Sequence, residues 1–108
     1  MNFIIPWPPK NLNPNARPHW RTKAACVKVY RAQAYYLTKS AHVSSNALVV
    51  GLVFRPPDKR HRDLDNCLAS FKAALDGIAD ALGVNDNQFK LSLSMGTPVK
   101  GGSVEITI

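Results

Sequence analysis

The stretch Ala-Leu-Val-Val-Gly-Leu-Val-Phe at residues 47–54, and a second stretch at residues 63–83, decide how this chain folds. The first is a nearly continuous apolar run of strand length, which is typical of a strand buried inside a sheet. In the second, which opens at Asp63, apolar residues recur at spacings of three and four, the pattern of a helix with one buried face. Those residues are Leu64, Leu68, Phe71, Leu75, Ile78 and Leu82, and Gly83 is a typical C-cap residue.

Outward from this strand and helix, similar patterns predict four more elements. They are a short strand at Asn2–Ile5, a helix at Trp20–Ala41, and strands at Phe89–Met95 and Val104–Ile108. The first strand is stopped by the prolines of residues 6–9, and the turn Lys100-Gly101-Gly102 predicts that the last two strands form a hairpin. We therefore expect an α+β fold in the order strand-helix-strand-helix-strand-strand, with both helices packed on a small mixed sheet.

The length of 108 residues is that of one domain, so we treat 1–108 as a single unit. No apolar run approaches the roughly 18 residues of a membrane span, and the N-terminus lacks the basic start of a secretory signal. Cys26 and Cys67 form neither a zinc spacing nor a disulfide framework. These features predict a protein of the reducing cytoplasm without a membrane partner.

The formal net charge of +7 is unevenly distributed along the chain. Residues 1–62 contain 11 basic residues and one acid, a sum of +10, whereas residues 63–108 contain three basic residues and six acids, a sum of −3. A basic half attracts a polyanion such as nucleic acid, although a merely soluble basic surface has the same composition. Acids beside a basic surface are what a metal-dependent enzyme acting on phosphates requires.

The sequence Asp63-Leu64-Asp65-Asn66 follows the basic run of residues 59–62 directly and opens the predicted helix. Two carboxylates two residues apart repel each other, and a divalent cation such as Mg²⁺ relieves that repulsion. The alternative is structural: Asp63 is an N-cap that accepts from the amide near Asn66, and Asp65 is a first-turn acid favoured by the helix dipole. The basic run and a third carboxylate, Asp86, favour the metal site.

The sequence resembles the RusA family of Holliday-junction resolvases, phage-type endodeoxyribonucleases, and the resemblance spans almost the whole chain. Four segments in family order carry it, and the basic lead with Asp-Leu-Asp-Asn is the most specific. They are Ile5-Pro6-Trp7-Pro8-Pro9, Arg62-Asp63-Leu64-Asp65-Asn66, Asn85-Asp86-Asn87-Gln88 and Lys100-Gly101-Gly102-Ser103-Val104-Glu105.

The resemblance implies that Asp63, Asp65 and Asp86 bind Mg²⁺, with Mn²⁺ as the alternative metal, and support phosphodiester hydrolysis. It also implies a symmetric homodimer that acts on four-way DNA junctions. Two positions depart from the family pattern: Ala69 stands where a lysine is usual, and Asn85 stands where many relatives have a second acid. Lys72, two turns after Asp65, either replaces the missing lysine in catalysis or is a surface lysine.

From these observations we predict a magnesium-dependent endonuclease that resolves four-way DNA junctions in recombination and repair. The residues expected to bind backbone phosphates are Lys59, Arg60, His61, Arg62, Lys10, Arg17 and Arg21. The alternatives are a catalytically inactive junction-binding module, a metal-dependent nuclease for flaps or RNA, and a small basic structural protein. Trp7 and Trp20 either stack on exposed bases or, as we expect, pack in the core or the dimer interface.

The position of Asp86 sets a geometric problem for the predicted metal site. A straight helix over residues 64–82 would be roughly 27 Å long, so Asp86 at its far end would hardly reach Asp63 and Asp65. Either the helix breaks near Gly77 and the chain turns back, or Asp86 completes the site of a partner subunit. Glycine is a poor residue for a helix interior, so we expect the break.

Overall fold

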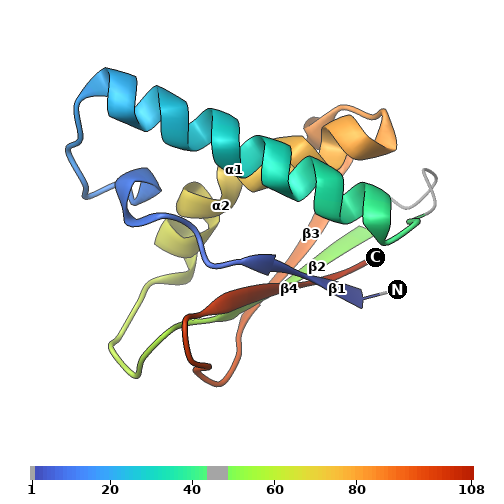
Figure 1. The fold of residues 1–108 in the computed structure, drawn as a ribbon. Coiled ribbons are helices and arrows are strands. Elements are labelled where there is room, and N and C mark those ends of the chain that lie inside the picture. Colours follow the sequence, from blue (N-terminus) through green and yellow to red (C-terminus); the bar gives the residue numbers. More distant parts are fainter. Residues whose placement is uncertain (1, 44–48) are drawn as a thin grey trace.

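The computed structural model of the chain describes residues 2–43 and 49–108, which form two helices and one four-stranded sheet (Figure 1). The strands are β1 (Asn2–Pro6), β2 (Val49–Arg55), β3 (Lys90–Met95) and β4 (Ser103–Thr107), and the helices are α1 (Trp20–Ser40) and α2 (Leu64–Leu82). Two short 3₁₀ turns, η1 (Lys10–Leu12) and η2 (Asp86–Gln88), lie in predicted loops. The predicted α+β fold is confirmed, whereas residues 47–48 of the predicted central strand lie outside the described residues.

The sheet is mixed, with the strand order β1-β4-β2-β3. β3 runs parallel to β2, and α2 provides the crossover connection that parallel neighbours need. β4 runs antiparallel to both β1 and β2 and lies between them. Both helices lie on the same side of this sheet, and the marked chain ends lie together at one end of it (Figure 1).

The predicted hairpin between the last two strands is wrong, because β3 and β4 lie on opposite sides of β2. The segment that connects β3 to β4 forms hydrogen bonds with the end of β2 and the residue after it, and it does not turn back along β3. The amide of Gly96 donates to the carbonyl of Phe54 at 2.9 Å, and the amide of Val99 donates to that of Pro56 at 2.9 Å. The glycine turn then leads into β4, with Gly101 and Gly102 at φ of 79° and 71°, values that favour glycine.

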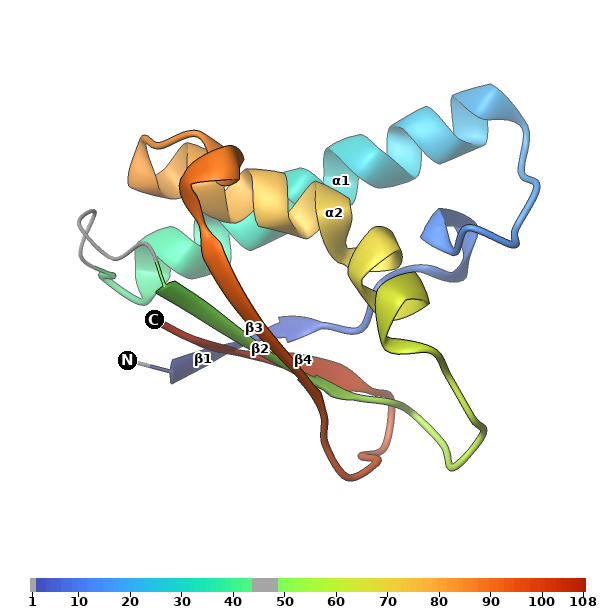
Figure 2. The same cartoon turned by 180° about the vertical axis from the view of Figure 1, so that it is seen from behind.

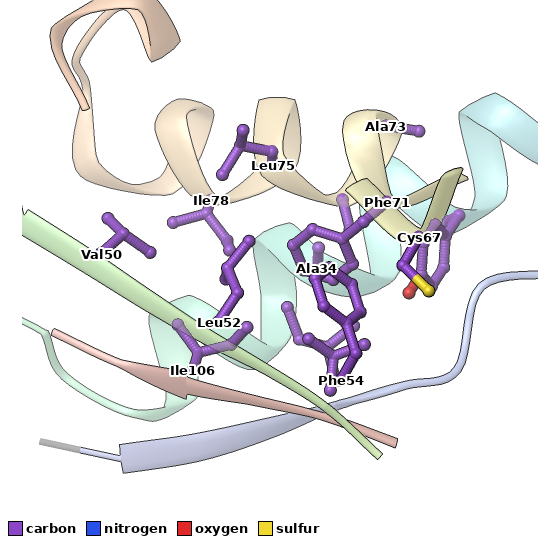
Figure 3. Close-up of a cluster of buried hydrophobic side chains, with 14 of the residues drawn as sticks. Ala34, Val50, Leu52, Phe54, Cys67, Phe71, Ala73, Leu75, Ile78 and Ile106 are labelled. Atoms are coloured by element: carbon purple, nitrogen blue, oxygen red, sulfur yellow. The ribbon is translucent and has the colours of Figure 1, made fainter. Parts of the chain in front are cut away.

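The core lies between the sheet and the helices (Figure 3). Alternate residues of β2, namely Val50, Leu52 and Phe54, are fully buried, as the period of a strand with one covered face requires. Opposite them, Phe71 and Ile78 of α2 are also fully buried. The helix predicted from the three- and four-residue spacing therefore faces the sheet with the expected residues.

A chain of aromatic rings ties the Pro-Trp segment after β1 into this core. Trp7 contacts Phe54 edge to face with ring centroids 6.3 Å apart, Phe54 contacts Phe71 at 5.9 Å, and Phe71 contacts Tyr30 at 6.1 Å. Burial raises the pKa of Tyr30, and its hydroxyl donates to the carbonyl of Pro6 at 2.6 Å. The expectation that Trp7 packs in the core is thus confirmed in part, since it remains half-buried.

α2 continues through Gly77, so the predicted break is wrong. Gly77 is needed for a different reason: a Cβ there would lie 2.2 Å from the carbonyl oxygen of Arg31 and 3.0 Å from the Cβ of Ala34. The two helices therefore cross in close contact at this residue. The bend of α2 seen in Figure 2 lies in the first half of the helix, where Ser70 Oγ donates to the carbonyl of Asn66 at 2.9 Å.

One ion pair joins the exposed sides of the two helices, and its pH dependence is a first prediction. Arg31 donates to both oxygens of Asp80, at 2.6 and 2.9 Å, and this contact lowers the pKa of Asp80. A lowered carboxyl pKa contributes stability that is complete above the unfolded pKa of about 3.9 and is lost as the pH falls through the folded value.

We expect Asp80→Asn to lower the free energy of unfolding by at most about 1 kcal/mol near neutral pH, because the pair is exposed. The difference from the unaltered protein should shrink as the pH falls below about 3.9. Urea unfolding of both proteins across this range measures it. A difference that stays constant down to about pH 2 would show that the ion pair is not its source.

No helix in the described ranges 2–43 and 49–108 is long and apolar enough to cross a membrane.

Candidate functional site

A groove of about 540 Å³ opens at the N-terminal end of α2. Three segments form its walls: residues 7–15 after β1, residues 57–62 after β2, and the first two turns of α2. Four of the residues predicted to bind phosphates line it, and Asp63 of the acidic motif lines it with them. Those four are Lys10, Arg60, His61 and Arg62.

The basic loop after β2 is organised by Asp58, which the sequence analysis did not single out. Asp58 Oδ1 accepts from the amide of Arg60 at 3.0 Å and from Nη1 of Arg62 at 2.8 Å, while Oδ2 accepts from Nε of Arg60 at 3.2 Å. The hydrogen bond from Arg62 holds the pKa of Asp58 well below its usual range. No sequence pattern marks this contact, because the four-residue pairing rule applies to helices and residues 58–62 form a loop.

Arg62 also contacts Trp7, the residue that the aromatic chain fixes to the core. Its guanidinium carbon lies 5.7 Å from the centre of the indole ring, a cation–π distance. Gly102 lies close to the same indole, because a Cβ on it would be 2.9 Å from the Trp7 Cγ. Trp7 therefore serves as a support for Arg62 at the wall of the groove.

Asp63 is the N-cap residue of α2, but its carboxylate makes no capping hydrogen bond. The structural alternative predicted one near Asn66; instead Asp63 Oδ1 lies 3.2 Å from Nε2 of His61. Because the ring nitrogen can carry a proton, this contact places a carboxylate beside a donor within the groove. Asp63 is thus available to a ligand there.

Asp65 and Asp86 are not among the residues that line the groove. Asp65 is exposed in the first turn, and residues 65, 72 and 76 share one face of the helix by its 3.6-residue period. After Gly83 the chain turns back over α2 (Figure 2), so that η2 lies beside the helix before β3 begins. Lys72 Nζ donates to Asp76 at 2.6 Å and also contacts Asp86 Oδ2.

Lys72 and the two acids form one ion-paired cluster. Burial alone would lower the pKa of Lys72, but the hydrogen bonds to Asp76 and Asp86 outweigh it and raise that pKa. The hydrogen bond from Lys72 lowers the pKa of Asp86. The sequence analysis missed Asp76, although the four-residue spacing to Lys72 is the usual signal for a helical ion pair.

The structure therefore does not bring Asp86 together with Asp63, as the predicted metal site required. Asp63 lies in the groove with the basic loop, and Asp86 lies with Lys72 on the outer face of α2. Among residues 2–43 and 49–108, no three His, Cys, Asp or Glu side chains form a group that could hold a metal ion. Carboxylate oxygens remain the donors that Mg²⁺ prefers, and it often uses only one or two of them together with substrate phosphates.

The other predicted phosphate-binding residues do not line the groove. Lys59 is exposed on the same loop, and Arg17 is exposed before α1. Arg21 lies over the ring of Trp20, with its guanidinium carbon 5.1 Å from the ring centre. Trp20 is 68% exposed, so the expectation that it packs in the core of this chain is wrong; packing at a dimer interface stays a prediction.

Comparison with known proteins finds a relative that matches almost the whole chain. An uncharacterized protein of Xylella fastidiosa (strain Temecula1) is 40% identical over 114 residues, which cover 99% of this chain and 74% of the relative. The chain belongs to the same protein family as this relative. No family model matches the chain.

Proposed function

We propose that the chain is a magnesium-dependent endonuclease that resolves branched DNA, in the manner of the RusA-like resolvases that its motifs resemble. One observation carries the proposal: Asp63 lies in the same groove as Lys10, Arg60, His61 and Arg62. A basic groove attracts a phosphodiester strand, and a carboxylate within it can hold the cation that phosphoryl chemistry uses. DNA recombination and repair in the cytoplasm is the corresponding cellular role.

The residues of the chain would divide the work as follows. Lys10, Arg60 and Arg62 hold backbone phosphates at the groove walls, and these contacts position DNA without reading its sequence. Asp63 and Asp65, at the start of α2, are the carboxylates that would hold the metal ion. Held there, Mg²⁺ would supply the Lewis acidity that phosphodiester hydrolysis uses. Asp86 would join them from its own chain or from a partner subunit.

A homodimer is part of the same proposal. A four-way junction has near two-fold symmetry, and a two-fold dimer would present one groove to each of the two strands that must be cut. The paired cleavage expected of a resolvase then follows from symmetry alone.

The second candidate function is a junction-binding module without nuclease activity. The contact of Lys72 with Asp86 favours it, because an internal ammonium neutralises the carboxylate that the metal site would use. The basic groove would still bind branched DNA in this case. Cleavage, rather than binding, separates the two candidates.

The test is a cleavage assay on a synthetic four-way junction, with the corresponding linear duplex and an RNA strand as comparison substrates. With Mg²⁺ we expect paired cuts in the junction alone, and with a chelator none. Asp63→Asn and Asp65→Asn should each lower the rate by about 100-fold or more. Asp80→Asn is the matched control, since it removes the same charge from the far end of α2 and should cleave normally. Full magnesium-dependent cleavage by Asp65→Asn would refute the assignment, and tight binding without cleavage by the unaltered protein would support the second candidate.

A further inference from the structure

The basic loop contains one carboxylate, that of Asp58. Judged by charge alone, this carboxylate should weaken the binding of phosphate to the loop. Asp58 is the single acidic residue in the first 62 positions, and it lies beside Arg60 and Arg62 at the groove wall. A carboxylate there weakens the attraction for a polyanion. Its contacts show what it does in return.

Asp58 and its neighbours occupy one end of the Arg62 guanidinium completely. Nη1 of Arg62 donates to Asp58 Oδ1 at 2.8 Å, lies 3.4 Å from the Asp58 carbonyl oxygen, and lies 3.1 Å from the Arg60 carbonyl oxygen. The two protons of Nη1 therefore face three acceptors. With the indole of Trp7 against the guanidinium, the group has one fixed orientation.

The other end of the guanidinium has no acceptor among residues 2–43 and 49–108. Within the described part of the chain, Nε and Nη2 of Arg62 make no hydrogen bond, although the side chain is only 20% exposed. No buried side-chain nitrogen or oxygen among these residues lacks a partner, so the unused donors reach solvent. Arg62 itself is one of the residues that line the groove.

We propose that Asp58 is a positioning residue that presents Nε and Nη2 of Arg62 to a DNA phosphate in the groove. These two nitrogens form the edge of a guanidinium that binds two phosphate oxygens side by side. The inference deepens the DNA-binding part of the proposed function and does not depend on cleavage. Asp58 acts through Arg62 and touches no substrate itself.

The test measures binding of a fluorescein-labelled synthetic four-way junction by anisotropy, in a chelator so that no cleavage occurs. We expect Asp58→Ala to bind about tenfold more weakly although the protein becomes more positive, because a fixed, charge-assisted contact is lost. Asp80→Ala is the matched control: it also removes one acid and leaves an arginine unpaired, but away from the groove. It should bind as the unaltered protein does or slightly tighter.

Two further variants separate positioning from damage to the loop. In an Arg62→Ala background, removing Asp58 should cause no further loss of affinity, whereas a misfolded loop would add its own loss. Arg62→Lys should bind about tenfold more weakly with an unchanged salt dependence, because the charge is kept and the two-nitrogen edge is lost.

The Nε–Hε NMR signal of Arg62, identified by its absence in Arg62→Lys, should shift when the junction is added and should not shift in Asp58→Ala. If Asp58→Ala bound as tightly as Asp80→Ala, or if the unaltered protein bound no junction, the inference would be overturned. Binding with the expected variant pattern but no magnesium-dependent cleavage would overturn only the proposed nuclease function.

Discussion

Gly77→Ala is expected to destabilise the protein, against the direction that helix propensity predicts. In an exposed helix interior, alanine in place of glycine stabilises by up to about 1 kcal/mol. Here the added Cβ would lie 2.2 Å from the carbonyl oxygen of Arg31, a backbone atom that cannot move without α1. We expect the free energy of unfolding to fall by about 1–3 kcal/mol or more, as overpacked cores do.

Urea unfolding followed by circular dichroism measures this change, and Gly51→Ala is its control. A Cβ at Gly51 would lie 3.4 Å from the Cβ of Thr107, which is an ordinary contact. The free energy of unfolding of this variant should therefore stay within about 0.5 kcal/mol of that of the unaltered protein, or be higher. A Gly77→Ala protein more stable than the unaltered one would contradict the close crossing of α1 and α2.

Phe71→Ala is expected to lower the free energy of unfolding by about 3–5 kcal/mol, the usual range for truncating a buried phenylalanine. Phe71 is fully buried and contacts Phe54 on one side and Tyr30 on the other. Against a total stability of about 5–15 kcal/mol for a domain, this loss removes a large share of the free energy of unfolding. Thermal unfolding should show a midpoint lowered by about 10 °C or more.

Tyr36→Ala is the matched control for this aromatic truncation. Tyr36 also lies on a helix but is 68% exposed, so its removal should change the free energy of unfolding by less than about 0.5 kcal/mol. Equal losses in the two variants would mean that the aromatic chain does not organise the core. Phe71→Leu, which keeps most of the volume, should restore most of the lost stability.

Local sequence patterns predicted the elements well because each pattern follows from one repeating geometry. The spacing from Leu64 to Leu82 predicted the face of α2 that is buried, and the apolar run at residues 47–54 predicted a strand inside the sheet. The run did not predict that only alternate side chains of β2 are buried, with Val49 62% exposed. The pairing of the strands was missed, because the turn at residues 100–102 is compatible with more than one partner for β4. Gly77 was predicted to break the helix because helix propensity takes no account of contacts between helices. The close contact of Gly77 with α1 is such a contact.

The candidate site was predictable in composition more than in arrangement. The basic loop and Asp63 do meet in one groove, since they are neighbours in sequence and a helix start holds them together. The place of Asp86 depends on how the chain returns over α2, which brings it to Lys72. Asp58 was overlooked because a single acid within a basic run has no pattern until its partner atoms are known.

The place of β4 between β1 and β2 also bears on how the protein folds. Asn2 pairs with Thr107, near the other end of the sequence, and among the described strands β1 pairs with β4 alone. Contacts so distant in sequence slow folding, because a long loop must close before they form. β2, α2 and β3 are close in sequence and can assemble together. β1 can join the sheet only after β4 has formed. Trp7 follows β1 directly and lines the groove, so we expect the groove to be complete only once β1 has paired with β4.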